Sequence, residues 1–438
     1  MQAYTPGSDL EDSLKCNFVD QIFSGITSRR KREKYAQDNF PYVAPEQQII
    51  GQNSRYHYVP LPKLLLVLCE IPDISAHLTT PEVDNHAPTV YRDFTDGQLY
   101  RHLLSLISPT AAHTIVILFY SDEIEIVNPL GAKRGMHKLL AIYCVLLNLH
   151  VKYRSQLQNI YLVMIVRYSY ISSYGLRAIL QPLVDDLKHL HEHGIKFYMR
   201  GIEEHAQVLV FGFCGDNLSL NRLGGFSCCF SSGRVCRFCM VYAKHLADKT
   251  SGAVCQAPTA SRHQLHLQAL AVNSIYNRRL YGVNEESPLE LAYFDGTRQL
   301  PPDLMHDILE GTTECVLRQV MKSLLSSGVL SKKDVEEISS FPYGPNDRKN
   351  KPVQVNMSFI NNKATLRGTA SSKWCVLRFI PLVLGPKVPE GNEDFELLLQ
   401  FREVTDIIFA PEIPAERLAY LDVLVETFLT EFANRYGR

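Results

Sequence analysis

Two aspartates stand where apolar runs of strand length end. Asp122 follows the run TIVILFY, and Asp216 ends the run AQVLVFGFCGD. Because adjacent parallel strands bring their C-terminal ends to the same edge of a sheet, we expect these aspartates to be neighbours although 94 residues separate them. Paired carboxylates bind divalent cations, and two such ions can activate the attacking oxygen and stabilise the leaving oxygen in phosphodiester chemistry. Alternatively, each aspartate only caps the segment that follows it.

A CxxC pair, Cys236 and Cys239, follows Asp216 by twenty residues. Two thiolates at this spacing can bind one Zn²⁺ from a single tight turn, which supplies half of a four-ligand site. A redox pair and two unrelated cysteines are the alternatives. The remaining ligands would come from outside this chain or from nearby histidines. Those histidines are His245, His263 and His266.

The segment PPDLMHDILEG contains several acids and one histidine. His306 and Glu310 lie four residues apart, so a helix would place them on one face, where they could bind a metal ion. Asp303 is predicted to cap this helix or to lie in its first turn, and Asp307 is a further acid of the segment. Glu310 is the candidate metal-site acid, with a packing or capping function as the alternative.

A local excess of basic residues follows the second aspartate. Residues 217–283 contain eight Lys and Arg residues and one acid, Asp248, although the whole chain is nearly neutral. Such an excess predicts a phosphate-binding patch, and a solvated surface face is the alternative. The arginines that we expect to contact nucleic acid are Arg222, Arg234, Arg237, Arg278 and Arg279.

The elements that must position these residues follow from apolar patterning. Three runs are typical of buried strands: TIVILFY, LLAIYCVLLNL and NIYLVMIVRYS. A helix is predicted after them, because Leu176, Leu183 and Leu190 belong to one apolar face and Gly194 can end the helix. Pro182 is expected to kink this helix rather than end it. The run that ends at Asp216 is then a fourth strand.

The overall charge limits the classes of partner. The chain has 45 basic and 46 acidic residues and a pI near 6.9, so it has no global attraction to nucleic acid or to anionic membranes. Its longest apolar stretches are shorter than a membrane-spanning helix, and we predict no membrane partner. The basic run from Arg29 to Lys34 is either a nuclear localisation signal or a solvated helix face. We predict a nuclear location, or otherwise a cytoplasmic one.

An ordered set of segments resembles proteins derived from the CACTA (En/Spm-like) transposases. These segments are YSDEIEIVNPLGAKRG, GDNLSLNRLGGF, CRFCM, LPPDLMHDILEG, NDRKNKP, SSKWCVLRFIP and REVTDIIFAPE. The resemblance implies a DDE-type DNA enzyme with a ribonuclease H-like core. Asp122 matches the first catalytic aspartate and Asp216 the second, and both would bind Mg²⁺. Cys236 and Cys239 match the first half of an inserted Zn²⁺ site.

The resemblance also implies a third catalytic acid, a glutamate that follows a histidine pair completing the zinc site. The sequence contains no such element before Arg438. We therefore expect the third acid to be missing, with Glu310 as the candidate substitute. On this reading the chain is a transposase-derived, nucleic-acid-binding protein that is catalytically incomplete. A non-enzymatic chromatin or protein-interaction scaffold is the alternative.

The expected architecture is an α/β fold. Its ribonuclease H-like core, a mixed sheet with flanking helices, is interrupted by a largely helical insertion that contains the zinc knuckle. The expected segments are residues 1–105 as a lead-in with short helices, 106–216 as the core, 217–290 as the basic CxxC insertion and 291–438 as a helical region. DNA and a second copy of the chain are the expected partners.

Overall fold

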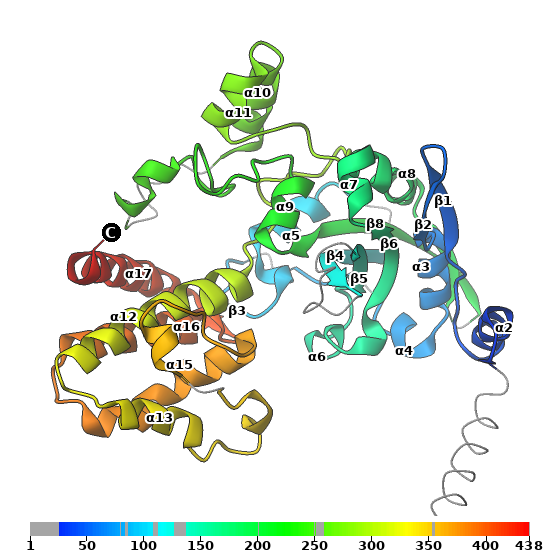
Figure 1. Ribbon diagram of the computed structural model, residues 1–438. Coiled ribbons are helices and arrows are strands. Elements are labelled where there is room, and N and C mark those ends of the chain that lie inside the picture. The colour runs from blue at the N-terminus through cyan, green and yellow to red at the C-terminus, as the bar shows by residue number, and fades with distance from the viewer. Residues whose placement is uncertain are drawn as a thin grey trace, which may run out of the picture. The chain divides into compact units, whose positions relative to one another are not determined.

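The protein is seen here as a computed structural model (Figure 1). It describes residues 26–78, 80–83, 86–107, 113–126, 137–199, 201–248, 250, 258–352 and 355–437. The chain forms two compact units, and each combines segments that are far apart in sequence. The first unit comprises Met1–Thr80, Ile107–Ile117 and Glu123–Val210. The second unit comprises Pro81–Leu106, Leu118–Asp122 and Phe211–Arg438.

A seven-stranded sheet has the strand order β1-β2-β6-β5-β4-β8-β7. The β1–β2, β2–β6, β5–β6 and β7–β8 pairs are antiparallel. The central strands are strongly apolar, and β4 buries Ile115, Val116, Ile117 and Phe119 completely. The strands are β1 (Glu46–Ile50), β2 (Ser54–Tyr58), β4 (His113–Glu125), β5 (Lys138–Leu146), β6 (Tyr161–Arg167), β7 (Ile195–Met199) and β8 (Ile202–Gly215).

The predicted order of three strands, a helix and a further strand is confirmed by β4, β5, β6, α8 and β8. One boundary was wrong, because β4 does not end at Asp122 but continues to Glu125. The continuation has a partner on the neighbouring strand, since Lys138 Nζ of β5 donates to Glu123 at 3.0 Å. A further strand, β7, lies between α8 and β8 and pairs with the start of β8.

Helix α8 (Leu176–His193) covers the sheet in the first unit. Its buried face includes Leu183 and Leu190, as the periodicity predicted, and the helix continues through Pro182 to end at Gly194. The hydroxyl of Tyr58 on β2 donates to Asp186 of α8 at 2.6 Å, which ties the helix to the sheet. The other helices of this unit are α2 (Arg29–Asn39), α3 (Leu61–Cys69), α4 (Pro72–Ser75), α6 (Val151–Arg154), η3 (Leu157–Asn159) and α7 (Ser169–Tyr174).

The second unit is mostly helical. Its C-terminal helices bury a shared apolar core that includes Val320, Leu377 and Phe401. A small antiparallel pair joins β3 (Val90–Tyr91) to β9 (Ile413–Pro414). The helices are η2 (Phe94–Asp96), α5 (Gln98–Leu104), α9 (Asn217–Leu223), η4 (Ala243–Asp248), α10 (Ala260–Leu270), α11 (Ser274–Tyr281), η6 (Met305–Thr312), α12 (Thr313–Ser326), α13 (Lys332–Ser340), η7 (Arg348–Asn350), α14 (Met357–Ile360), α15 (Ala370–Leu384), η8 (Gly385–Lys387), α16 (Glu393–Ile408) and α17 (Ala415–Tyr436).

Among the helices that the structure describes, none combines the length and the apolar character needed to cross a membrane. The basic run from Arg29 to Lys34 lies in α2, a helix with no buried residue.

Candidate functional site

The strands β4 and β8 run parallel where they approach the two aspartates. The rings of Phe119 and Phe213 stack at 4.8 Å, and a Cβ atom on Gly215 would lie 2.7 Å from the carbonyl oxygen of Ser121. Both contacts join residues 94 positions apart, and the residue numbers rise together along the two strands. The next pair in this register is Asp122 and Asp216. The register therefore brings these two residues to one edge of the sheet, within the second unit.

Asp216 also has a capping role. Its Oδ1 accepts a hydrogen bond from the backbone N–H of Ser219 at 2.6 Å, so it is the N-cap of α9. The Ser219 hydroxyl lies 3.0 Å from the hydroxyl of Ser121, which joins the start of α9 to β4. The capping alternative is therefore confirmed for Asp216. Asp122, by contrast, lies within β4, three residues before its end.

A third carboxylate acts at the same edge. Burial raises the pKa of Tyr120, and the negative charges of Asp122, Asp303 and Asp216 raise it further, in that order. Burial, followed by the charge of Asp303, also raises the pKa of Cys214 to about 11. The charge of Asp303 therefore acts on the same side chain, Tyr120, as the charges of Asp122 and Asp216. From sequence, Asp303 is expected only as a helix cap or a first-turn acid, because its distance along the chain from Asp122 and Asp216 hides this proximity.

Asp303 is held by the helix that follows it. Its Oδ1 accepts from the backbone N–H groups of Met305 and His306 at 3.1 and 3.2 Å, which confirms the predicted capping role. Its Oδ2 pairs with Nδ1 of His306. Burial opposes the charge on this imidazole, but the hydrogen bond and charge of Asp303, with the charges of Glu310 and Asp216, raise the pKa of His306 overall. Both oxygens of Asp303 are thus occupied.

The segment from Met305 to Thr312 is the π-helix η6 rather than an α-helix. π-Helical backbone is rare in proteins and is found frequently at functional sites. Asn217 of α9 donates to Asp307 in this element at 2.5 Å, so α9 and η6 are joined beside the aspartates. Within this element, His306 and Glu310 lie close enough for the charge of Glu310 to raise the pKa of His306, and metal binding by the two stays a prediction.

Glu310 lies against a buried lysine. Lys373 Nζ lies 3.5 Å from Glu310 and 2.8 Å from Glu314, and its side chain is only 7% exposed. A buried cation needs such partners, because an uncompensated charge in a protein interior is costly. This pairing agrees with the packing function that was the alternative for Glu310.

Several carboxylate oxygens near this edge already have partners within the chain. Two metal ions about 4 Å apart need several carboxylate oxygens that converge on them. Asp216 uses one oxygen to cap α9, and Asp303 uses both oxygens within its own helix. Within the described residues, three or more His, Cys, Asp or Glu side chains do not come together in the arrangement of a metal site. We therefore derive no metal-dependent step at this edge.

The CxxC pair forms a tight turn, in which the backbone N–H of Phe238 donates to the sulfur of Cys236 at 3.4 Å. Cys236 and Cys239 are both of intermediate exposure. Two of the candidate histidine ligands pack against rings instead: His263 against Phe226 at 5.1 Å, and His266 against Tyr281 at 4.3 Å. Zinc at the two cysteines stays a prediction.

Arg237 is buried and takes no part in a basic surface. Its side chain donates to Asn217 at 2.8 Å, to Asn221 at 3.1 Å and to the carbonyl of Pro301 at 2.9 Å, and the residue is 5% exposed. These bonds hold α9 against the segment that leads to Asp303. We therefore treat Arg237 as a positioning residue and leave it out of the phosphate-binding set.

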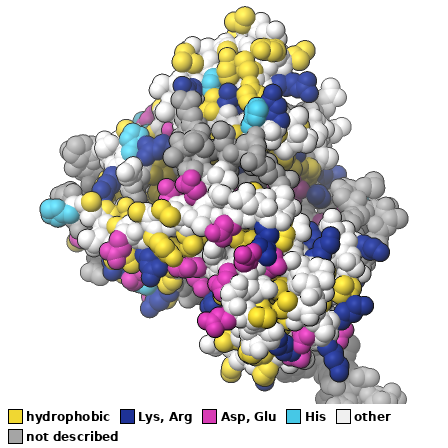
Figure 2. Space-filling view, turned by 90° about the vertical axis from the view of Figure 1, so that its left-hand side faces the viewer, with side chains coloured by type: hydrophobic (Ala, Val, Ile, Leu, Met, Phe, Trp, Pro, Cys, Tyr) yellow, Lys and Arg dark blue, Asp and Glu magenta, His cyan; other side chains and the backbone are white. Residues whose placement is uncertain are grey.

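The other predicted arginines are more accessible. Arg278 and Arg279 are exposed in the last turn of α11, and Arg234 lines the same hollow as they do. Arg222, in α9, interacts with the nearby thiol of Cys228. Figure 2 shows basic side chains beside hydrophobic ones at the top of the view, where α10 and α11 lie.

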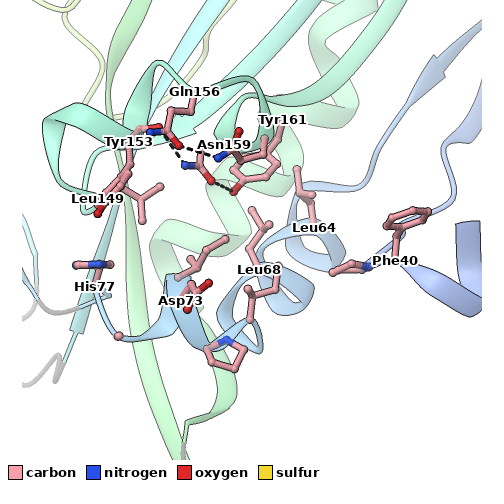
Figure 3. Close-up of a pocket in the computed structure, with 16 residues that line it drawn as sticks. Phe40, Leu64, Leu68, Asp73, His77, Leu149, Tyr153, Gln156, Asn159 and Tyr161 are labelled. Carbon is pink, nitrogen blue, oxygen red and sulfur yellow. Dashed lines mark hydrogen bonds between the residues drawn. The ribbon is translucent and has the colours of Figure 1, made fainter.

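A separate cavity of about 830 Å³ lies in the first unit, between α3, α4 and the segment around η3 (Figure 3). Its polar groups bond to one another: Asn159 donates to the carbonyl of Tyr153 at 3.0 Å and accepts from Tyr161 at 3.4 Å. Leu64 and Leu68 supply part of its apolar wall. None of the described residues that line it is Lys or Arg, so these residues do not select a phosphate.

No protein family model matches this sequence, and no curated protein matches it.

Proposed function

We propose that this chain is a transposase-derived protein with a ribonuclease H-like core, and that it binds DNA without cutting it. The observation that carries the proposal is the parallel register of β4 and β8, with Asp122 and Asp216 as the next pair after Ser121 and Gly215. A pair of neighbouring carboxylates on two central parallel strands is what the resemblance to DDE transposases leads us to expect.

The sheet order supports the same proposal. Taken in chain order from β4, the core strands are arranged as third, second, first and fourth, namely β6-β5-β4-β8, with α8 before the fourth strand. A ribonuclease H-like core is expected to have this arrangement. The β1–β2 hairpin and β7 would then be additions at the two sides of the sheet.

The region after Asp216 supports DNA binding. Arg278 and Arg279 are exposed, and guanidinium groups are suited to phosphate oxygens. Two exposed aromatic residues lie in the same part of the chain, Phe230 at 49% and Tyr276 at 62% exposure. Aromatic rings beside basic residues are the combination on which unpaired bases stack.

The state of the carboxylates supports the absence of cleavage. Asp303 would be the third acid by position, but its oxygens are committed to the start of η6 and to His306. Catalysis of phosphodiester transfer is mostly the placement of metal ions, so a site with one committed acid should not hold both ions. Zn²⁺ at Cys236 and Cys239, weak Mg²⁺ binding, homo-oligomerisation and nuclear localisation belong to the same proposal.

The test combines cleavage and binding by the full chain. Supercoiled plasmid incubated with Mg²⁺ or Mn²⁺ should stay supercoiled, while labelled duplex DNA should bind and then dissociate as NaCl is raised. Metal-dependent nicking that disappears in Asp122→Asn, but not in the exposed control Asp185→Asn, would contradict the non-cleaving part of the proposal. Loss of salt-sensitive binding would contradict the DNA-binding part and favour a scaffold.

A further inference from the structure

A polar hollow of about 470 Å³ lies in the second unit, between the loop that follows β8 and α9 and the end of α11. Three arginines contribute to its lining, and no Asp or Glu belongs to the described residues that line it. A cavity with positive charge and hydroxyl groups is suited to an oxyanion. The lining residues are Ser227, Cys228, Cys229, Ser232, Gly233, Arg234, Arg278, Arg279 and Asn284.

The arginines have different roles in the hollow. Arg234 is a wall residue, since its Nε donates to the carbonyl of Leu280 at 2.6 Å and its guanidinium stacks on Tyr242 at 4.7 Å. Arg278 is positioned through Nε, which donates to the carbonyl of Asn284 at 3.1 Å. This hydrogen bond does not use the two terminal nitrogens of Arg278. Those nitrogens are the ones that form bidentate contacts with phosphate.

Close backbone approaches fix the shape of the hollow. Gly233 has a φ of +76°, and a Cβ there would lie 3.0 Å from the carbonyl oxygen of Arg279. Gly282 has a φ of +68°, and a Cβ there would lie 2.8 Å from the carbonyl oxygen of Arg234. The N–H of Ser227 donates to the carbonyl of Gly282 at 2.8 Å. The loop and the helix end are therefore joined by main-chain contacts that side chains could not replace.

A thiol in the same hollow provides a reporter. Cys229 is exposed, and its sulfur lies 3.3 Å from the hydroxyl of Ser232 and 3.5 Å from that of Ser231. Hydrogen bonds from Ser232 and Ser231 lower the pKa of Cys229 to about 6. Its neighbour Cys228 differs, because burial raises the pKa of that thiol. At neutral pH, Cys229 is therefore the more reactive of the two toward alkylating agents.

We propose that this hollow binds one phosphate group of the DNA backbone, with Arg278 and Arg279 as its cationic ligands and the Ser227 hydroxyl as a neutral donor. The Ser227 oxygen accepts from the N–H of Cys229 at 3.2 Å, so its O–H can donate to the phosphate. This inference rests on the proposed function, because it assigns the phosphate to DNA. A phosphate held there lies beside Cys229, where its negative charge disfavours the thiolate and its bulk covers the sulfur.

The experiment measures the rate at which iodoacetamide alkylates Cys229 in the full chain. A Cys228→Ser background makes Cys229 the one thiol of its peptide, so that mass spectrometry reports it alone. The probes are inorganic phosphate and a short DNA duplex, each compared with NaCl at equal ionic strength. If bound phosphate raises the thiol pKa by one unit, the thiolate fraction at about pH 6 falls about fivefold, and the rate falls with it.

Both probes should slow alkylation, and the protection should disappear in the Arg278→Gln/Arg279→Gln double variant. Arg262→Gln is the matched control, because Arg262 lies on α10 and is not among the residues of the hollow; it should keep the protection. If neither probe changed the alkylation rate of Cys229, the proposed phosphate site would be wrong, even if another method detected DNA binding by the chain. Protection by inorganic phosphate but not by DNA would overturn the assignment to DNA.

If the arginines only stabilised the end of α11, where cations are favoured, the double variant would lower the unfolding temperature and leave protection intact. That result would also overturn the proposal.

Discussion

The carbonyl oxygen of Ser121 lies where a side chain on Gly215 would have to go, 2.7 Å from the position of its Cβ atom. Gly215→Ala should therefore force β4 and β8 apart just before Asp122 and Asp216. Overpacking of this kind costs about 1 to 3 kcal/mol of unfolding free energy, which urea denaturation can measure. Gly344→Ala is the control, because a Cβ on Gly344 meets nothing within 4 Å. Equal stabilities for the two variants would show that the strands are not packed this closely.

The charge and the capping role of Asp216 can be separated by two substitutions. Asn caps helices as well as Asp does, so Asp216→Asn should keep the stability contributed by the 2.6 Å bond to the Ser219 N–H. Asp216→Ala should lose about 1 kcal/mol. Thermal unfolding of the two variants beside the wild type measures the difference. Equal losses in both variants would mean that the charge of Asp216, and not its cap, stabilises the fold.

The central strands and the position of Asp216 directly after β8 could be predicted from sequence because local patterns specify them. The β-branched run before Asp122 and the apolar face of α8 require no knowledge of distant segments. The end of β4 could not be predicted, because its continuation depends on the cross-strand pair of Glu123 with Lys138. Without that pair, the polar residues that follow Asp122 indicate that the strand ends in a turn.

Two further features could not be predicted from sequence. These are the approach of Asp303 to Asp122 and Asp216, and the burial of Arg237. Each depends on tertiary contacts between segments far apart in sequence, and arginine is seldom buried. A signal for Arg237 did exist in retrospect, since Asn217 and Asn221 lie one helical turn apart and together accept two of its hydrogen bonds. A count of basic residues in the sequence does not distinguish a buried arginine such as Arg237 from an exposed one.

The pairing of His306 with Asp303 predicts a pH dependence. The pKa of His306 is raised above its ordinary value of 6.5, so the folded state favours the protonated form. Its contribution to stability is complete below that ordinary pKa and is lost as the pH rises through the folded-state value. The loss of unfolding free energy in His306→Gln, measured by urea denaturation, should therefore be larger at about pH 5.5 than at about pH 8.5. Because His306 is partly exposed, the loss should stay below about 1 kcal/mol. A loss that grows with pH would contradict the pairing.

The serine hydroxyls around Cys229 predict the reactivity of its thiol. Removing one of them by Ser232→Ala should raise the pKa of Cys229 from about 6 and move the alkylation profile to higher pH. The other titratable groups that line the hollow are Cys228, Arg234, Arg278 and Arg279, and the arginines stay charged throughout. The measurement is alkylation rate against pH in the Cys228→Ser background. Ser340→Ala, on α13, should leave the profile unchanged.

The salt dependence of DNA binding tests the central claim most directly. The wild-type chain should bind duplex DNA with an affinity that falls linearly in a plot of log K against log [NaCl], because phosphate contacts release counterions. The Arg278→Gln/Arg279→Gln variant should give a slope shallower by about 1, the value for the loss of one phosphate contact. A wild-type slope near zero, or no binding at low salt, would contradict the account of this chain as a DNA-binding protein.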